Sequence, residues 1–172
     1  MKKSTKQIIQ WSVLSLFVLV GGIAIVASGN DYEDRQPVQQ FSAGILQTAD
    51  ASFDFETISM KDGKVSHDFV AENSGEEPVI ITKVYTSCMC TAAQITDGAG
   101  NVRGIFGMPG HAGPSSADIE VAPGERITIE AIFDPAAHGP SGVGLAQRSV
   151  YLETNSGTSP KLEFSFQATV MR

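Results

Sequence analysis

The chain's two cysteines, Cys88 and Cys90, are the residues best suited to chemistry, and they stand one residue apart. They follow an apolar, largely β-branched run at residues 79–84, which is typical of a central strand. Side chains two residues apart on a strand face the same way, so a continuing strand would present both sulfurs on one side. This spacing is compatible with a labile, redox-active disulfide, with thiolates for a soft metal, or with buried thiols in a structural role.

A metal site would need more ligands than two sulfurs, and histidine and methionine supply the candidates. Met108 and His111 belong to a Met-Pro-Gly-His segment in a glycine-rich stretch that could fold back onto the cysteines. Thiolate, thioether and imidazole ligands favour Cu(I), or zinc when the thioether is left out. We therefore predict the metal ligands Cys88, Cys90, His111 and Met108, with copper or zinc as the cofactor. His138, in a second stretch rich in Gly and Pro, is a less favoured ligand.

Several short runs alternate apolar and polar residues with a period of two, the pattern of half-buried β strands. Turn residues such as Asn, Asp, Gly and Pro separate the runs, which begin at Phe53, Val65, Ile127, Val150 and Leu162. These runs show no convincing helical period, so we expect an all-β, antiparallel sandwich of about seven strands over residues 52–172. His67 shares the apolar face of its run and is expected to pack in the core.

Residues 92–118 interrupt this pattern with many glycines and with Pro109 and Pro114. A structureless stretch of that length inside a compact domain is usually either functional or disordered. We therefore expect a long loop there, which either reaches the cysteines or contacts a partner.

The N-terminus has the pattern of a membrane anchor. Lysines near the start precede an uncharged run, and the apolar stretch that begins at Ile8 is about 20 residues, enough to cross a bilayer core. Acidic residues follow it, so the basic end should stay in the cytoplasm. We predict a cytoplasmic basic tail (1–7), a transmembrane signal anchor (8–28) and a linker (29–51), of which residues 43–46 could dock on the domain.

A cleaved signal peptide is the alternative, because residues 26–28 read Val-Ala-Ser and resemble a small-residue cleavage site. The apolar run is longer than the usual signal-peptide core of about 7–15 residues, which favours the uncleaved anchor. In either case the domain would lie outside the cytoplasm, where disulfides persist. We expect a single-pass protein of the cell membrane with an extracytoplasmic C-terminal domain, in the periplasm or at the cell surface.

Charge and motifs argue against several classes of function. The net charge of −7 disfavours nucleic acid as a partner, because phosphate binding needs a basic surface. The sequence has no Gly-x-Ser-x-Gly elbow, no phosphate-binding loop and no His-Glu-x-x-His motif. We therefore expect a protein that is not an enzyme.

Three segments together resemble a known bacterial family. Residues 53–58 read Phe-Asp-Phe-Glu-Thr-Ile, residues 73–78 read Asn-Ser-Gly-Glu-Glu-Pro, and residues 87–91 read Ser-Cys-Met-Cys-Thr. These motifs are similar to those of the domain-of-unknown-function family 1573 (DUF1573) and fall within a resemblance that covers residues 52–170. The resemblance implies an immunoglobulin-like β-sandwich of the PapD-like and ASPM/SPD-2/Hydin-like type. Met89 replaces the family's glycine between the cysteines and is expected to fill the core.

This family has no settled biochemical role, so the resemblance implies a fold more than a function. The first functional hypothesis is a membrane-anchored, extracytoplasmic module with a binding or structural role. It would bind a protein partner by strand addition at an open sheet edge or through the loop at residues 92–118. The alternatives are a soft-metal binding protein and a thiol–disulfide exchange protein, both of which use Cys88 and Cys90.

Overall fold

The computed structural model describes residues 41–111 and 113–172. The predicted cytoplasmic tail (1–7) and signal anchor (8–28) lie outside the described residues, as does the predicted linker (29–51) up to residue 40. In the described part of the chain, we find no helix with the length and apolar character needed to cross a bilayer.

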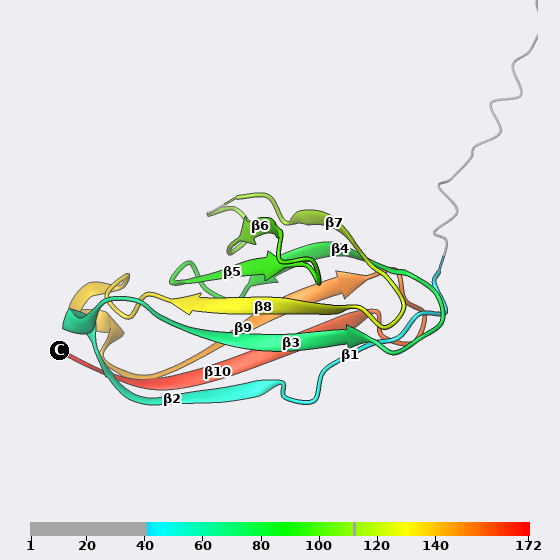
Figure 1. Ribbon diagram of the computed structural model, residues 1–172. Helices are drawn as coiled ribbons and strands as arrows, with labels where there is room; N and C mark the ends of the chain where they lie inside the picture. Colours follow the sequence, from blue (N-terminus) through cyan, green and yellow to red (C-terminus); the bar gives the residue numbers. More distant parts are fainter. Residues whose placement is uncertain (1–40, 112) are drawn as a thin grey trace, which may run out of the picture. The chain divides into compact units, whose positions relative to one another are not determined.

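In the described residues, ten strands form two five-stranded sheets that pack as two layers (Figure 1). The first sheet has the strand order β1-β3-β8-β5-β6, and the second has the order β2-β10-β9-β4-β7. The strands are β1 (Leu46–Gln47), β2 (Ser52–Ser59), β3 (Val65–Asn73), β4 (Val79–Thr86), β5 (Thr91–Thr96), β6 (Val102–Phe106), β7 (Ser116–Val121), β8 (Arg126–Phe133), β9 (Gly144–Thr154) and β10 (Lys161–Met171), with short 3-10 helices η1 (Met60–Asp62) and η2 (Gly139–Gly142). The all-β sandwich is confirmed, with ten strands in place of the expected number of about seven.

The core lies between the two sheets because alternate residues of each long strand point inward. In β8 and in the middle of β10, every second residue is buried. Phe69 of β3 and Phe164 of β10 meet across the interface, with ring centroids 5.2 Å apart. Burying a side chain of this size stabilises the fold by about 2–3 kcal/mol relative to leaving it in water. The period of two in the sequence therefore predicts the core correctly.

One edge of the second sheet differs from the expected antiparallel arrangement. β2 pairs in parallel with β10, and Ser52 lies opposite Ser165. β2 and β3 belong to different sheets, so the chain between them crosses from one layer to the other. Gly63 turns the chain there with a φ of 86°, a conformation that glycine adopts at little cost.

The predicted loop over residues 92–118 is wrong for most of its length, because it contains most of β5, all of β6 and the start of β7. Asp97 closes the β5–β6 hairpin: its Oδ1 accepts hydrogen bonds from the backbone N–H of Ala99 (3.0 Å) and of Asn101 (2.8 Å). The pKa of Asp97 is held below its usual value, first by the hydrogen bonds from the backbone and the side chain of Asn101 and less by the bond from Ala99, against the opposing effect of burial. Among the described residues of this stretch, those outside strands lie in the hairpin turn (97–101) and after β6 (107–111 and 113–115).

The end of the predicted linker is part of the domain. Leu46 is buried, and β1 pairs with β3. The side chain of Asn73, which is 0% exposed, holds this segment in place. Its Oδ1 accepts from the N–H of Ile45 (3.2 Å) and Gly75 (3.1 Å), and its Nδ2 donates to the carbonyls of Glu77 (2.8 Å) and Val121 (2.9 Å). The folded unit therefore begins before the expected boundary at residue 52.

Candidate functional site

The two cysteines lie in the turn between β4 and β5, not on a continuing strand as predicted. β4 belongs to the second sheet and β5 to the first, so the chain has to leave its sheet at this point. The Thr86 hydroxyl fixes the turn, because its oxygen lies 3.0 Å from the carbonyl oxygens of both Cys88 and Thr91 and its single proton is shared between them. The N–H of Thr91 also donates to the Cys88 carbonyl (3.1 Å). The sheet crossing thus brings the two cysteines into a tight bend.

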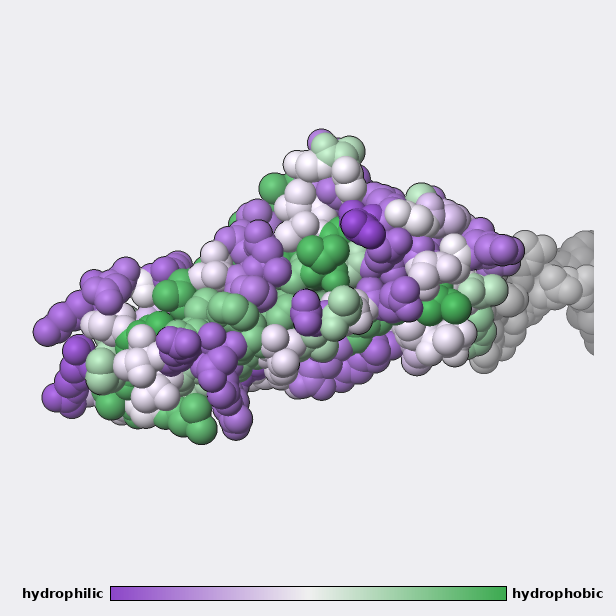
Figure 2. All heavy atoms as spheres, turned by 60° about the horizontal axis from the view of Figure 1, so that its bottom comes forward, coloured by the Kyte–Doolittle hydropathy of each residue, from purple (hydrophilic) through white to green (hydrophobic). Residues whose placement is uncertain are grey.

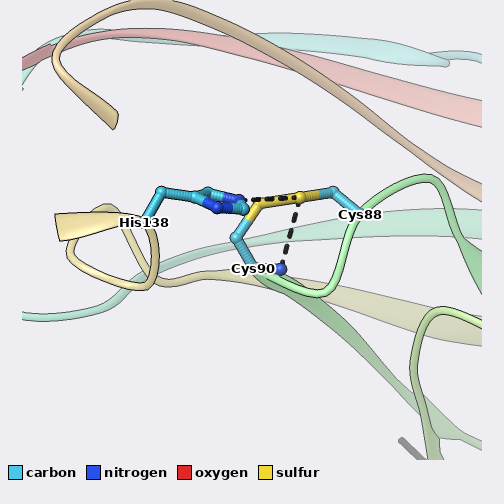
Figure 3. Close-up of side chains that lie close together, drawn as sticks. All are labelled: Cys88, Cys90 and His138. Carbon is cyan, nitrogen blue, oxygen red and sulfur yellow. Dashed lines mark hydrogen bonds between the residues drawn. A yellow bond between two sulfur atoms is a disulfide. The ribbon is translucent and has the colours of Figure 1, made fainter. Parts of the chain in front are cut away.

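Cys88 and Cys90 form a disulfide within this bend (Figure 3). Their Cα atoms are 5.3 Å apart, inside the range that disulfides usually span. Cys90 is only 3% exposed, whereas Cys88 is half-buried. A molecule from outside therefore has better access to the sulfur of Cys88 than to the sulfur of Cys90.

A basic side chain contacts each sulfur. The Nε2 atom of His138 lies 3.3 Å from Cys88 Sγ, and Figure 3 shows the imidazole directed at the sulfurs. The Nε–H of Arg148 donates to Cys90 Sγ at 3.0 Å. His138 comes from the exposed loop after β8, which is held nearby because the N–H of Asp134 donates to the Cys90 carbonyl (2.9 Å). Three separate parts of the chain therefore build this site.

The structure brings together Cys88, Cys90 and His138, whose ligand atoms all lie within 4.8 Å of one another. His111 does not belong to this group. It lies in the turn after β6, where its N–H donates to the carbonyl of Met108 (3.1 Å). Metal binding by His111 and Met108 stays a prediction, and the less favoured His138 is the histidine that contacts a cysteine.

Arg148 is the site residue that sequence reasoning missed, although the sequence contains a signal for it. Ala146, Arg148 and Val150 share one face of β9, and both apolar neighbours are buried. A charged residue in the middle of an apolar face usually has a specific partner. Here the partner is the sulfur of Cys90.

Of two residues expected to pack in the core, His67 does so and Met89 does not. Met89, expected in the core, is 54% exposed, because the bend turns its side chain outward. His67 packs as expected: its ring stacks on Phe53 with centroids 3.6 Å apart and meets Phe69 edge-on. His67 therefore serves packing and not this site.

A cavity of about 610 Å³ opens beside the site. Its lining includes Ser87 and Ser149, which flank the disulfide turn, together with Arg148 and residues of β2 and β10. The Ser149 N–H donates to the Ser87 hydroxyl (2.9 Å), so β9 supports this side of the turn. Arg148 lines the cavity and also contacts Cys90 Sγ, so this side chain connects the cavity to the disulfide.

The two facing five-stranded sheets define an immunoglobulin-like β-sandwich. Within it, residues 46–101 match the family described as "Protein of unknown function (DUF1573)", which confirms the resemblance seen in the sequence. The matched segment contains Asn73 and both cysteines, but neither His138 nor Arg148.

Among solved structures, a protein of unknown function from Porphyromonas gingivalis W83 overlaps with a TM-score of 0.52 at 14% identity. The overlap covers 77% of this chain and 51% of that chain, so this chain spans about half the length of the Porphyromonas protein. The ASH/PapD-like domain 7 of human CEP192 overlaps more loosely, with a TM-score of 0.45 at 15% identity, over 77% of this chain and 87% of that domain. These likenesses concern the fold alone. The comparison with curated proteins found no match.

Proposed function

We propose that this protein is a membrane-anchored, extracytoplasmic module whose Cys88–Cys90 pair exchanges disulfides with a thiol-bearing polypeptide. The observation that carries the proposal is the placement of His138 against Cys88 and of Arg148 against Cys90. The anchor and the location rest on the N-terminal sequence pattern. A disulfide between the cysteines supports the location, because disulfides persist in oxidising compartments.

The exchange begins when a thiolate of the partner attacks the more exposed sulfur, that of Cys88. The bond between the two cysteine sulfurs breaks, the partner becomes linked to Cys88, and Cys90 leaves as a thiolate. A second thiolate of the partner then attacks the partner's own sulfur in this mixed disulfide and releases Cys88. The partner's dithiol is oxidised to a disulfide, and the same two electrons reduce the Cys88–Cys90 pair to a dithiol.

The two basic side chains suit the two halves of this exchange. The guanidinium of Arg148 already donates to Cys90 Sγ, so it stabilises the negative charge that develops on that sulfur as it leaves. The imidazole of His138 lies next to Cys88 Sγ, where it can accept the proton of the incoming thiol and return it to Cys88 after release. The N–H of Cys90 gives Cys88 Sγ one more donor at 3.3 Å.

The surface around the site supports a polypeptide partner. Figure 2 shows hydrophobic residues gathered at the end of the domain where β9 begins and β10 ends. The large apolar side chains exposed at this end include Val143, Leu145 and Met171, of which Leu145 is 67% exposed. Exposed apolar residues that cluster in this way are typical of surfaces that contact other proteins.

The test is the rate at which dithiothreitol reduces the disulfide of the full-length protein in detergent micelles. Alkylation of the released thiols, read by mass spectrometry, gives this rate. A hydrogen bond to a charged group is worth about 1.5–3 kcal/mol, and about half of the charge has developed in the transition state of exchange. Arg148→Met should therefore slow the reduction about 3- to 12-fold.

Arg126→Met is the matched control, because Arg126 pairs with Glu72 (2.8 Å) on the surface and contacts neither sulfur. This variant should be reduced at the wild-type rate. If Arg148→Met and Arg126→Met are both reduced as fast as the wild type, Arg148 has no role in exchange and the proposal fails.

A further inference from the structure

Reduction of the disulfide would leave two sulfurs and an imidazole nitrogen facing one another. Cys88 Sγ, Cys90 Sγ and a ring nitrogen of His138 lie within 4.8 Å of one another, and all three converge in Figure 3. Two donor atoms that each lie about 2.0–2.3 Å from one ion are at most about 4.6 Å apart. Small rotations of the side chains therefore suffice for a single ion to bind all three atoms.

We propose that the dithiol form of this protein binds one Cu(I) ion through Cys88, Cys90 and His138. Thiolates are soft ligands that select Cu(I) or zinc among the common metals. A structural zinc site uses four protein ligands, whereas this cluster offers three. Copper accepts both thiolate and imidazole ligands, so this donor set of two thiolates and one imidazole fits Cu(I).

The charges around the cluster point to the same ion. Two thiolates and one Cu(I) carry a net charge of −1, and the guanidinium of Arg148, 3.0 Å from Cys90 Sγ, balances it. With Zn²⁺ the same ligands would be neutral and would not balance the positive charge of Arg148 beside them. Arg148 and the nearby Thr91 hydroxyl, 3.8 Å from Cys90 Sγ, also hold this sulfur in place from outside the ligand set.

Metal binding and the disulfide exclude each other, because a sulfur bonded to the other sulfur is no longer a thiolate. A dithiol partner of the kind named in the proposed function supplies two electrons and two protons and converts the disulfide to the dithiol. Cu(I) then displaces the two protons as it binds. This inference therefore rests on the reducibility that the proposed function requires, and it makes copper binding dependent on the redox state of the pair.

The experiment uses the full-length protein in detergent micelles, without oxygen, after reduction by a phosphine and not by a thiol. Cu(I) is supplied as its complex with bathocuproine disulfonate, and the fall in absorbance of that complex measures how much copper the protein removes. The reduced wild type should remove one Cu(I) per chain, and the oxidised wild type and Cys88→Ser/Cys90→Ser should remove none. X-ray absorption should show two sulfur donors and one nitrogen donor.

His138→Ala should weaken the binding of Cu(I) by at least about tenfold. Because His138 is exposed, its removal should leave the β signal in circular dichroism unchanged. His111→Ala is the matched control and should bind Cu(I) as the wild type does, since His111 lies outside the cluster.

Equal binding by the reduced and oxidised protein would overturn the proposal, as would wild-type affinity in His138→Ala. Displacement of the copper by an equal amount of zinc would overturn the choice of ion. Because the phosphine reduces the pair without thiol exchange, failure to bind copper contradicts this inference alone. Unchanged exchange rates in Arg148→Met contradict the proposed function alone.

Discussion

Asn73 offers a quantitative test of what joins the start of the domain to its core. Asn73→Ala removes four hydrogen bonds to backbone groups at once. The bond to Val121 is buried, so the loss of its donor should cost about 1–3 kcal/mol. The other three are partly accessible to water, which can replace them at a cost of about 0.5 kcal/mol each. The free energy of unfolding should therefore fall by about 3 kcal/mol.

Urea unfolding, followed by the β signal in circular dichroism, measures this loss. The single tryptophan, Trp11, lies outside the described residues, so its fluorescence is not a suitable probe. For a slope of about 1.5–2 kcal/mol per molar urea, the midpoint should fall by about 1.5–2 M with no change in slope.

Asn101→Ala is the control of matched chemistry. Its side-chain amide bonds Asp97 at an exposed hairpin, so its removal should move the midpoint by less than about 0.3 M. Equal midpoints for Asn73→Ala and Asn101→Ala would refute the reasoning, because burial would then make no difference to the cost of losing the amide.

Two further substitutions test the docked segment and the surface charges. Gly44→Ala would place a Cβ against the backbone carbonyl of Glu77 and 2.6 Å from a methyl of Val79, so the midpoint of thermal unfolding should fall by several degrees. An unchanged midpoint would mean that the segment around Gly44 is not docked on the domain. The pKa of Glu153 is held below its usual value by hydrogen bonds from Lys83 first and from the Tyr85 hydroxyl, against the opposing effect of burial. The ionised carboxylate therefore stabilises the fold above about pH 4.5, and this stabilisation is lost as the pH falls further. Lys83 and Glu153 are both partly exposed, so Glu153→Gln should lower the free energy of unfolding by only about 0.5 kcal/mol at pH 7 and by almost nothing at about pH 3, as measured by urea titration. An equal loss of free energy at both pH values would contradict this assignment.

The sequence predicts strands well where apolar residues alternate. The runs that begin at Val65, Ile127 and Leu162 lie in strands whose inward residues form the core, and the run that begins at Phe53 lies in a strand whose inward residues are half-buried against it. β5 and β6 were missed because they carry small and polar residues, and because Gly104 interrupts the apolar pattern of β6. The parallel pairing of β2 with β10 was missed because alternation along one strand does not indicate its neighbour.

The site was predictable only in part, for a related reason. The spacing of Cys88 and Cys90 pointed to the pair that forms the disulfide, but treating the pair as part of a strand overlooked the need for β4 to leave its sheet. His138 and Arg148 lie 50 and 58 residues from their sulfur partners in the chain, and only the closed sandwich brings them together. His111 was favoured because flexibility allowed it to reach the cysteines, whereas the end of β8 positions His138 there directly.

The parallel pairing of β2 with β10 bears on when this domain can fold. β10 lies between β2 and β9, so until β10 is present β2 has no partner in its sheet and β9 has only β4. A growing chain thus cannot complete its second layer until β10 has emerged, since pairing between strands as distant in sequence as β2 and β10 is slow to form. A chain that stops before Lys161 would leave two long strands open to pairing with other chains, and it should aggregate instead of yielding a smaller stable unit.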